Sequence, residues 1–503
     1  MNRTTLSLIG ASTVLAAVTG LTALTAPDPH AGTGAPSAAR LPVQRSTLLC
    51  PQPSASDLAE TRYTAHTPPD DVTGEGEAAL LPLAEKDDGL GGDESGPQAG
   101  GGKEAEPFLP LKKPGTPVTD TVGTADAPAL AGSAEGPLAP GWTVQQTTVV
   151  SAGSGRGMYG TGCQAPDTDF WFPGASTAEG RQDFVHLTNP DDSAAVVDLG
   201  LHGEDGAIES DAGEALTVPP RSTLRVLLST LTDEPVADLT VHGVVRTGRV
   251  SAQVQAADEK TGGDWLPTAG VPRPTAVIPG IPADATSVRL VVHAPGASDA
   301  DLAVRLATPS GTITPAGAET LHVKSGTTSA VDLDSLTQGA AASLSLAPTD
   351  DGDTAPVVAA VRVTRGKGDA QETAFIPATT PVEKRATAAG NRTKDSTLSL
   401  LALGRGAEVR VTASAGTDGG SPQSRTYTLK QGTTTDVEAP RPEDGKGPYA
   451  LTVERVSGGE VYAARTLARK QNGVPMFTVQ ALPDDRGRVA VPRASQDLTV
   501  LNQ

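Results

Sequence analysis

The seven histidines are the first place to look for metal or acid–base chemistry in this chain of 503 residues. They are His30, His66, His186, His202, His242, His293 and His322. No two of them form a His-x-His or His-Glu-x-x-His pair, the spacings that place two zinc ligands side by side. The 2 Cys cannot make a four-thiolate zinc site. The sequence therefore predicts no metal site.

Motifs for nucleophilic catalysis are also missing from the sequence. There is no Gly-x-Ser-x-Gly elbow, and the alternation of strands and helices that such hydrolases need is absent. Lys324-Ser325-Gly326 resembles the Lys-Thr-Gly strand of penicillin-binding enzymes, but no Ser-x-x-Lys motif accompanies it. A later copy of the same stretch reads Lys430-Gln431-Gly432, which is typical of a turn. We expect a protein that is not an enzyme and needs no cofactor.

Aromatic side chains are scarce, with 3 Trp, 5 Tyr and 6 Phe. Trp142, Trp171 and Trp265 are the candidates for a saccharide-stacking platform, or alternatively for core positions. Trp171 stands between Phe170 and Phe172, and strand alternation would turn its ring away from both neighbours. The sequence favours a core position for Trp171 that shields a disulfide, with a ligand platform as the alternative.

The N-terminus has the layout of an export signal. Arg3 precedes an apolar run from Leu6 to Ala26 with small residues towards its end. We interpret residues 1–27 as a signal peptide or, if it is not cleaved, a single membrane anchor. Residues 28–40 read as a flexible tether. Both interpretations place the rest of the chain outside the cytoplasm, secreted or associated with the envelope.

The two cysteines, Cys50 and Cys163, are expected to pair outside the cytoplasm. Such a disulfide closes a loop of about 113 residues. It also implies that residues 41–66 supply the first strand of the same sandwich as the residues after 141.

Negative charge is concentrated in one stretch of the chain. The formal net charge is −20, which argues against nucleic acid as a partner. Residues 67–140 contain 14 acidic and 4 basic residues, together with 13 Gly and 11 Pro. This composition predicts a disordered acidic insert, because it offers little apolar area to offset backbone entropy.

Short runs of alternating Val, Leu, Thr and Ala, separated by turn residues, dominate from residue 141 onward. They predict an all-β chain of three tandem antiparallel β-sandwich (Ig-like) domains, at residues 141–280, 281–385 and 386–503. One strand pair recurs in every copy and is interpreted as a hairpin, beginning with Leu216-Thr217-Val218 and Leu224-Arg225-Val226. Each copy ends on a proline-containing strand: Trp265-Leu266-Pro267, Phe375-Ile376-Pro377 and Ala481-Leu482-Pro483.

The chain resembles a known family in one arrangement of residues, Cys50…Cys163-x7-Trp171 followed by Leu187-Thr188-Asn189-Pro190. With the export signal and repeated sandwiches, the chain resembles a family of uncharacterised secreted or membrane-associated proteins, a domain of unknown function, of high-GC Gram-positive bacteria. The resemblance covers most of residues 41–503. It implies location and fold only, because no activity or catalytic residue is established for that family.

Two classes of function remain. The first is a non-enzymatic exported cell-envelope protein that acts as a structural or interaction scaffold, with strand edges open to an envelope protein. The alternative is a protein that binds a cell-wall glycan or another polysaccharide, which would need an exposed aromatic or polar cleft. Membrane anchoring through the N-terminal segment is compatible with both.

Overall fold

The computed structural model describes residues 39–85, 106–125, 127–334, 336–350, 352 and 354–491. The predicted signal or anchor at 1–27 and nearly all of the tether lie outside these residues. The described part is all-β, as predicted, and contains no α-helix. Its helical pieces are four short 3-10 turns: Gly136–Leu138, Asp211–Gly213, Leu228–Thr230 and Gly368–Ala370.

The chain divides into two compact units. The described residues of the smaller unit form a two-stranded sheet of β1 (Ala39–Pro42) and β34 (Arg488–Val491). The larger unit, Pro42–Gly487, carries all the other strands and is the one described below.

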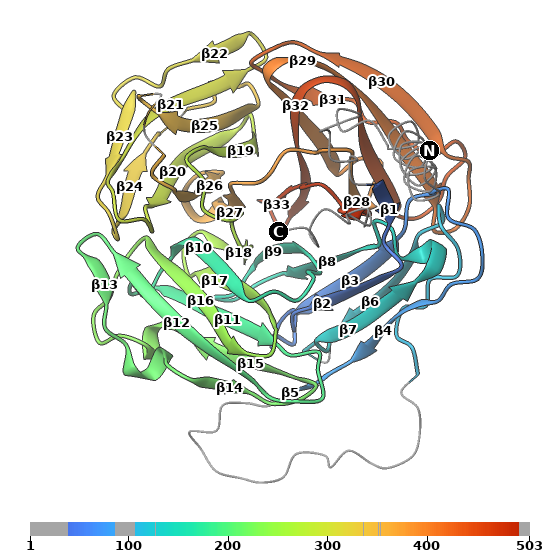
Figure 1. Ribbon diagram of the computed structural model, residues 1–503, viewed down its shortest axis with the longest axis horizontal. Coiled ribbons are helices and arrows are strands. Elements are labelled where there is room, and N and C mark those ends of the chain that lie inside the picture. The colour runs from blue at the N-terminus through green and yellow to red at the C-terminus, as the bar shows by residue number, and fades with distance from the viewer. Residues whose placement is uncertain are drawn as a thin grey trace, which may run out of the picture. The chain divides into compact units, whose positions relative to one another are not determined.

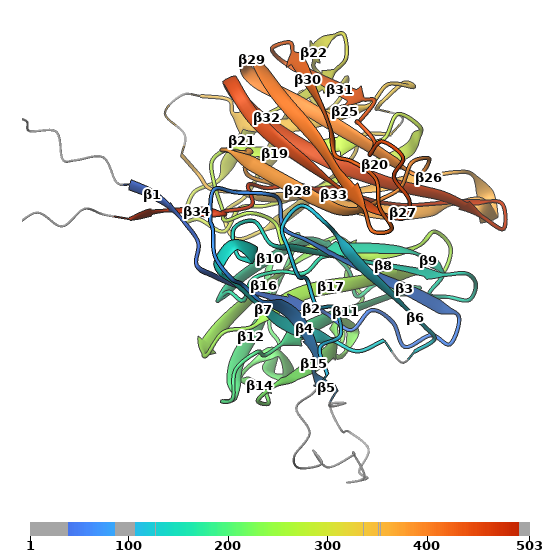
Figure 2. The ribbon, with the colours of Figure 1, turned by 90° about the vertical axis from the view of Figure 1, so that its right-hand side faces the viewer.

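One arrangement of two antiparallel sheets recurs four times in the larger unit (Figure 1). In the third module, one sheet has the order β19-β25-β21 with β22 and β23 also on β21, and the other has the order β24-β20-β26-β27. The first module repeats this order as β2-β7-β4 and β6-β3-β8-β9, and the second as β10-β16-β12 and β15-β11-β17-β18. Parallel pairing of β9 with β18 joins the larger sheets of these two modules into one nine-stranded sheet. In the fourth, two long strands belong to both sheets and join them (Figure 2).

The strand bounds of the first and second modules are as follows. The first module comprises β2 (Arg45–Cys50), β3 (Ala59–His66), β4 (Ala78–Pro82), β6 (Val118–Gly123), β7 (Leu130–Glu135), β8 (Thr143–Val150) and β9 (Gly157–Gly162). Strand β5 (Ala84–Glu85) pairs with β15 of the second module. The second comprises β10 (Asp169–Ala175), β11 (Arg181–Thr188), β12 (Ala195–Gly203), β13 (Gly206–Ile208), β14 (Leu216–Val218), β15 (Ser222–Leu227), β16 (Leu239–Thr247), β17 (Ser251–Asp258) and β18 (Gly262–Leu266).

The third and fourth modules follow. The third comprises β19 (Ala276–Ile281), β20 (Ala285–His293), β21 (Ala300–Thr308), β22 (Gly311–Ile313), β23 (Thr320–Val323), β24 (Thr328–Asp332), β25 (Ala342–Pro348), β26 (Val358–Arg365) and β27 (Glu372–Pro377). The fourth comprises β28 (Arg385–Asn391), β29 (Ser396–Gly416), β30 (Gln423–Leu429), β31 (Thr433–Val437), β32 (Tyr449–Gln471) and β33 (Val474–Ala481).

Each module buries one hydrophobic core to which both of its sheets contribute. Strand β12 shows the cause, since Val197, Leu199 and Leu201 are buried at alternate positions and face the core. Burial of each such side chain stabilises the fold by about 1.5–3 kcal/mol. In strands such as β12, a period of two therefore specifies which face turns inward, whereas the inner strands β18 and β27 are buried on both faces.

The last strand of each module lies innermost and is called its inner strand: β9, β18, β27 or β33. The inner strands contact one another in a closed cycle, β9 with β18, β18 with β27, β27 with β33 and β33 with β9 (Figure 1). Large side chains cross these contacts. Phe375 of β27 packs into the core of the second module, and Phe477 of β33 packs into that of the third.

The prediction that residues 67–140 form a disordered insert is wrong for much of their described part. Strands β4, β6 and β7 lie there, and Leu80 and Leu130 are buried in one core with Cys50 and Tyr63. Each strand is only five or six residues long and is separated from the next by Gly, Pro and acidic residues. The average composition of residues 67–140 therefore did not indicate these strands. Residues 86–105 lie outside the described part.

Two further expectations about organisation need correction. Residues 41–66 and 141–163 join the former insert to make a module of their own, so the first sandwich begins well before residue 141. The expected boundary at 280 falls inside β19, which pairs with β25 of the third module. The boundary at 385 coincides with the start of β28.

The recurring strand pair is not a hairpin. Strand β14 pairs with β12, whereas β15 pairs with β11 in the opposite sheet, so the chain crosses from one sheet to the other. Strands β23 and β24 repeat this crossing in the third module. The alternation of apolar and polar residues specifies the buried face of a strand, but it does not show which strand pairs with it.

Candidate functional site

A cavity of about 450 Å³ lies where the four inner strands end. We call it the axial cavity. Its walls include the last residues of β9 and β33 and the residues at or just after the ends of β18 and β27. The three proline-containing strand ends of the sequence repeat meet here, since Pro267, Pro377 and Pro483 all line it. All four modules contribute to the wall, which makes the axial cavity the candidate site.

Two of the three tryptophans line the axial cavity. Trp142 precedes β8 and Trp171 lies in β10, and their side chains are 5% and 7% exposed. Trp265 lies elsewhere and is fully buried against Ala59, Val150 and Tyr159. None of the three forms an exposed platform, but two indoles form part of a cavity wall.

The predicted disulfide between Cys50 and Cys163 is present, with the Cα atoms 4.4 Å apart. Cys163 follows β9 and lines the axial cavity. The tryptophan in the core cluster that holds the disulfide is Trp142, whereas Trp171 packs with Ala269 and Val358. The disulfide-shielding indole is therefore not the one that the sequence favoured.

Alternation along β10 explains the position of Trp171. Phe170 and Phe172 are buried in the core of the second module, and Trp171 faces the other way, as expected. Its ring stacks on that of His242, with centroids 3.6 Å apart.

Three histidines surround Trp171. The ring centroids of His293 and His202 lie 5.5 and 6.4 Å from the indole, and 4.6 Å from each other. Burial lowers the pKa of His202 and His242, and lowers that of His293 to about 4. The cluster is therefore neutral at pH 7. Sequence spacing could not reveal it, because the histidines come from β12, β16 and β20, in two modules.

The acidic groups at the edge of the axial cavity hold the chain in place. The Asp485 carboxylate accepts a hydrogen bond from Arg385 Nε at 2.5 Å, and Arg385 Nη2 donates to the Pro140 carbonyl oxygen at 3.2 Å. Asp484 Oδ2 accepts the backbone N–H of Lys384 at 2.7 Å. Burial raises the pKa of Asp485. Arg385 therefore links the fourth module to the first through Pro140, and the Asp485 carboxylate holds its guanidinium in position.

Two carboxyl groups missed by the sequence analysis lie on the inner strands, outside the cavity wall. Asp264 Oδ1 accepts the backbone N–H of Gly160 at 2.9 Å, and Glu372 Oε1 accepts that of Met158 at 3.2 Å. Both carboxyls are fully buried. Burial raises the pKa of Glu372 to about 8 and raises that of Asp264 well above its usual range. They join β18 and β27 to β9.

Within the described residues, no group of three or more His, Cys, Asp or Glu side chains is placed to hold a metal ion. The described part also contains no helix with the length and apolarity to cross a membrane. The wall of the axial cavity consists of indoles, amides, hydroxyls, a few charged groups and small apolar residues, a combination suited to holding a ligand.

Comparison with known proteins gives a family but no activity. No curated protein matches the chain. The model of a family described as a family of unknown function, DUF5719, matches residues 118–440, from the start of β6 to beyond the end of β31. This agrees with the resemblance to an uncharacterised family. Because the match spans more than half of the chain, the chain belongs to the DUF5719 family of unknown function.

Proposed function

We propose that this protein is a non-enzymatic, exported cell-envelope protein that binds a saccharide of the envelope in the axial cavity. The observation that carries the proposal is the cavity itself, about 450 Å³ in volume and walled by all four modules. Ligand sites in proteins have volumes of about 300–1,000 Å³ and favour such convergence points.

The wall chemistry supports a saccharide. Trp142 and Trp171 supply apolar area, and Gln145, Gln164 and Gln480 supply amide groups. Threonine hydroxyls add further donors and acceptors, from Thr143, Thr161, Thr268, Thr379, Thr380 and Thr387. Sugars combine apolar faces with hydroxyl rims, so they suit a wall that mixes indoles with neutral polar groups.

The engaged state of the wall carboxylates supports binding rather than catalysis. Asp485 is held by Arg385, and Asp484 accepts the backbone N–H groups of Lys384, Arg385 and Arg486. Asp169 faces His242, with 3.6 Å between Oδ2 and Nε2. We therefore do not propose that any two of these carboxyl groups act as the catalytic pair of a glycosidase.

Export is supported by the disulfide and by the apolar N-terminal segment. Disulfides persist in oxidising compartments and are rare in the cytosol. Anchoring through residues 1–27, and a scaffold role towards an envelope protein, remain predictions from the sequence.

Titration with soluble fragments of peptidoglycan and of envelope polysaccharides tests the proposal by calorimetry. Thr379→Trp places a large ring in the cavity wall and should abolish binding. Thr428→Trp, on the exposed strand β30, is the matched control and should leave it unchanged. Equal affinity of both variants and the unaltered protein would place the ligand elsewhere. Failure of every fragment to bind would refute a saccharide function.

A further inference from the structure

A second, smaller cavity lies between the first and fourth modules, where the cycle of modules closes. Its volume is about 50 Å³, and its wall includes Met158, at the opposite end of β9 from the axial cavity. The remaining wall comes from β3, β8, β28, β32 and the turn after β28. We call it the seam cavity. It shares no lining residue with the axial cavity.

Three arginines line the seam cavity. Arg62 comes from β3 of the first module, and Arg392 and Arg469 come from the fourth. One carboxylate, that of Asp395, lines it with them. The wall therefore carries an excess of two positive charges in a protein whose formal net charge is −20.

These arginines are poorly neutralised. Arg62 lies 3.6 Å from the carboxylate of Glu60, which is itself 57% exposed. Within the described part of the chain, no carboxylate oxygen lies within 4.0 Å of the Arg392 or Arg469 guanidinium. Many other arginines do have such partners, among them Arg181, Arg246, Arg289 and Arg410. Among the described residues, other arginines such as Arg305 and Arg405 also lack a carboxylate oxygen within 4.0 Å, but Arg392 and Arg469 line one cavity together with Arg62.

The remaining wall suits a small oxyanion. Thr147 supplies a hydroxyl donor, and the buried side chains of Met158 and Leu467 supply apolar surface beside the charges. One water molecule needs roughly 10–15 Å³ of cavity volume. The seam cavity, at about 50 Å³, therefore has room for about four oxygen-sized groups. Guanidinium groups match the geometry of phosphate oxygens.

We propose that the seam cavity is a binding site for a phosphate group, held by Arg62, Arg392 and Arg469. The bound group would bridge the first and fourth modules and neutralise like charges across their contact. This inference goes beyond the saccharide function and does not depend on it.

The test is binding of inorganic phosphate, measured by calorimetry and by the thermal unfolding midpoint, against chloride at matched ionic strength. We expect saturable binding and a rise in the midpoint with phosphate only. The double variant Arg392→Gln/Arg469→Gln should bind phosphate at least about a hundredfold more weakly, because it removes two charged hydrogen bonds and each contributes about tenfold or more to the affinity. Without phosphate this variant should be at least as stable as the unaltered protein, which separates lost binding from misfolding.

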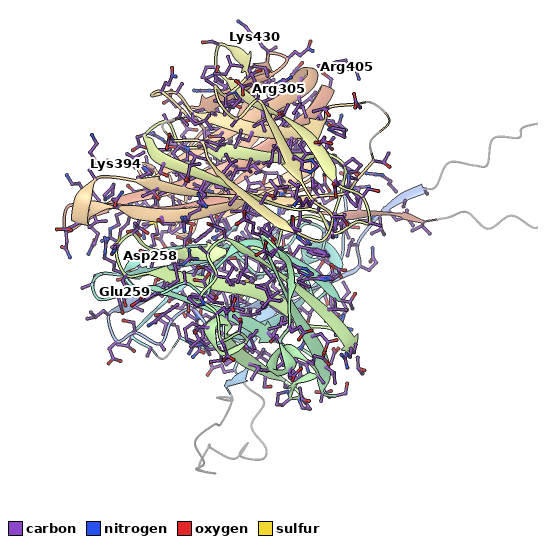
Figure 3. The ribbon with its side chains drawn as sticks, turned by 90° about the vertical axis from the view of Figure 1, so that its left-hand side faces the viewer. Asp258, Glu259, Arg305, Lys394, Arg405 and Lys430 are labelled. Atoms are coloured by element: carbon purple, nitrogen blue, oxygen red, sulfur yellow. A yellow bond between two sulfur atoms is a disulfide. The ribbon has the colours of Figure 1, made fainter. Side chains whose placement is uncertain are left out.

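Arg405→Gln is the matched control. Arg405 is exposed, and Figure 3 shows it far from Lys394, which lies in the same turn as Arg392 and Asp395. The control should bind phosphate normally. Equal responses to phosphate and chloride would overturn the proposal, and so would undiminished binding by the double variant.

The source of the phosphate group is distinguished by two further probes. Glycerol phosphate represents a soluble or wall-borne phosphate, and vesicles with phosphatidylglycerol represent a lipid headgroup. Arginine-dependent binding of glycerol phosphate without vesicle co-sedimentation assigns the site to the first source. Arginine-dependent co-sedimentation assigns it to the second.

Discussion

Replacing Glu372 by glutamine probes the contact between inner strands that the fold depends on. Glu372 begins β27, is fully buried, and accepts the backbone N–H of Met158 on β9. Its Oε2 lies 3.6 Å from Arg156 Nη1. Burial raises the pKa of the carboxyl to about 8, although Arg156 and the N–H of Met158 oppose the rise.

The size and sign of the effect follow from proton binding. The pKa is 4.5 for an ordinary glutamate and about 8 in the folded chain, so the folded state binds more protons between these values. The resulting stability is fully present below about pH 4.5 and is lost as the pH rises through 8. The loss is at most about 1.4 kcal/mol per pH unit and roughly 5 kcal/mol in total. Glutamine has no such titration.

The assay is urea unfolding of the unaltered protein and Glu372→Gln at several pH values from 4.5 to 9. Subtracting one unfolding free energy from the other removes the contributions that the other titrating groups make to the pH dependence. The variant should gain stability relative to the unaltered protein as the pH rises, and the gain should level off above pH 8. Glu60→Gln, at a side chain that is 57% exposed, measures the effect of removing a surface charge. A difference that is flat across this range, or that falls with pH, would refute the buried-carboxyl reasoning.

Two other perturbations test how the modules are held. Replacing Cys50 and Cys163 together by serine should lower the free energy of unfolding by about 4.8 kcal/mol in the chain-entropy model, because the disulfide closes a loop of 113 residues. Chemical denaturation of the two proteins measures this loss. A loss below about 1 kcal/mol would contradict the prediction. Gly160→Val should destabilise by about 1–3 kcal/mol, because even a Cβ there would lie 2.4 Å from the side chain of Thr478. Thermal unfolding of Gly160→Val is compared with that of Gly123→Val, where the added Cβ meets nothing within 4 Å, so that crowding is separated from general effects of valine. Equal midpoints for the two variants would show that the inner strands can move apart.

The fold class was predictable because two-residue alternation is local. Strand β12 shows it in Ala195, Val197, Leu199 and Leu201, and no knowledge of partners is needed to read it. Pairing was not predictable, because β14 and β15 are adjacent in sequence yet belong to opposite sheets. A polar turn joins both a hairpin and a crossing between sheets, so turn residues alone do not separate the two.

The candidate site was predictable only in part. The three proline-containing strand ends were recognised as repeats, but their convergence on one cavity depends on how whole modules pack. The histidines around Trp171 are single residues on three strands, so no motif search finds them. Buried Asp264 and Glu372 look like ordinary surface acids in a chain of 59 acidic residues.

The N-terminal module shows why average composition misleads about function as well as fold. Its strands are short and are flanked by polar residues. The average composition of the 74 residues from 67 to 140 therefore does not reveal them. Yet it supplies Trp142 and Cys163 to the axial cavity, Arg62 to the seam cavity, and the inner strand β9. Strand β9 contacts both β18 and β33, so the second and fourth modules meet through it. The described part of the acidic stretch therefore belongs to the folded module that contributes to both proposed sites, and its Leu80 and Leu130 are buried in the core of that module.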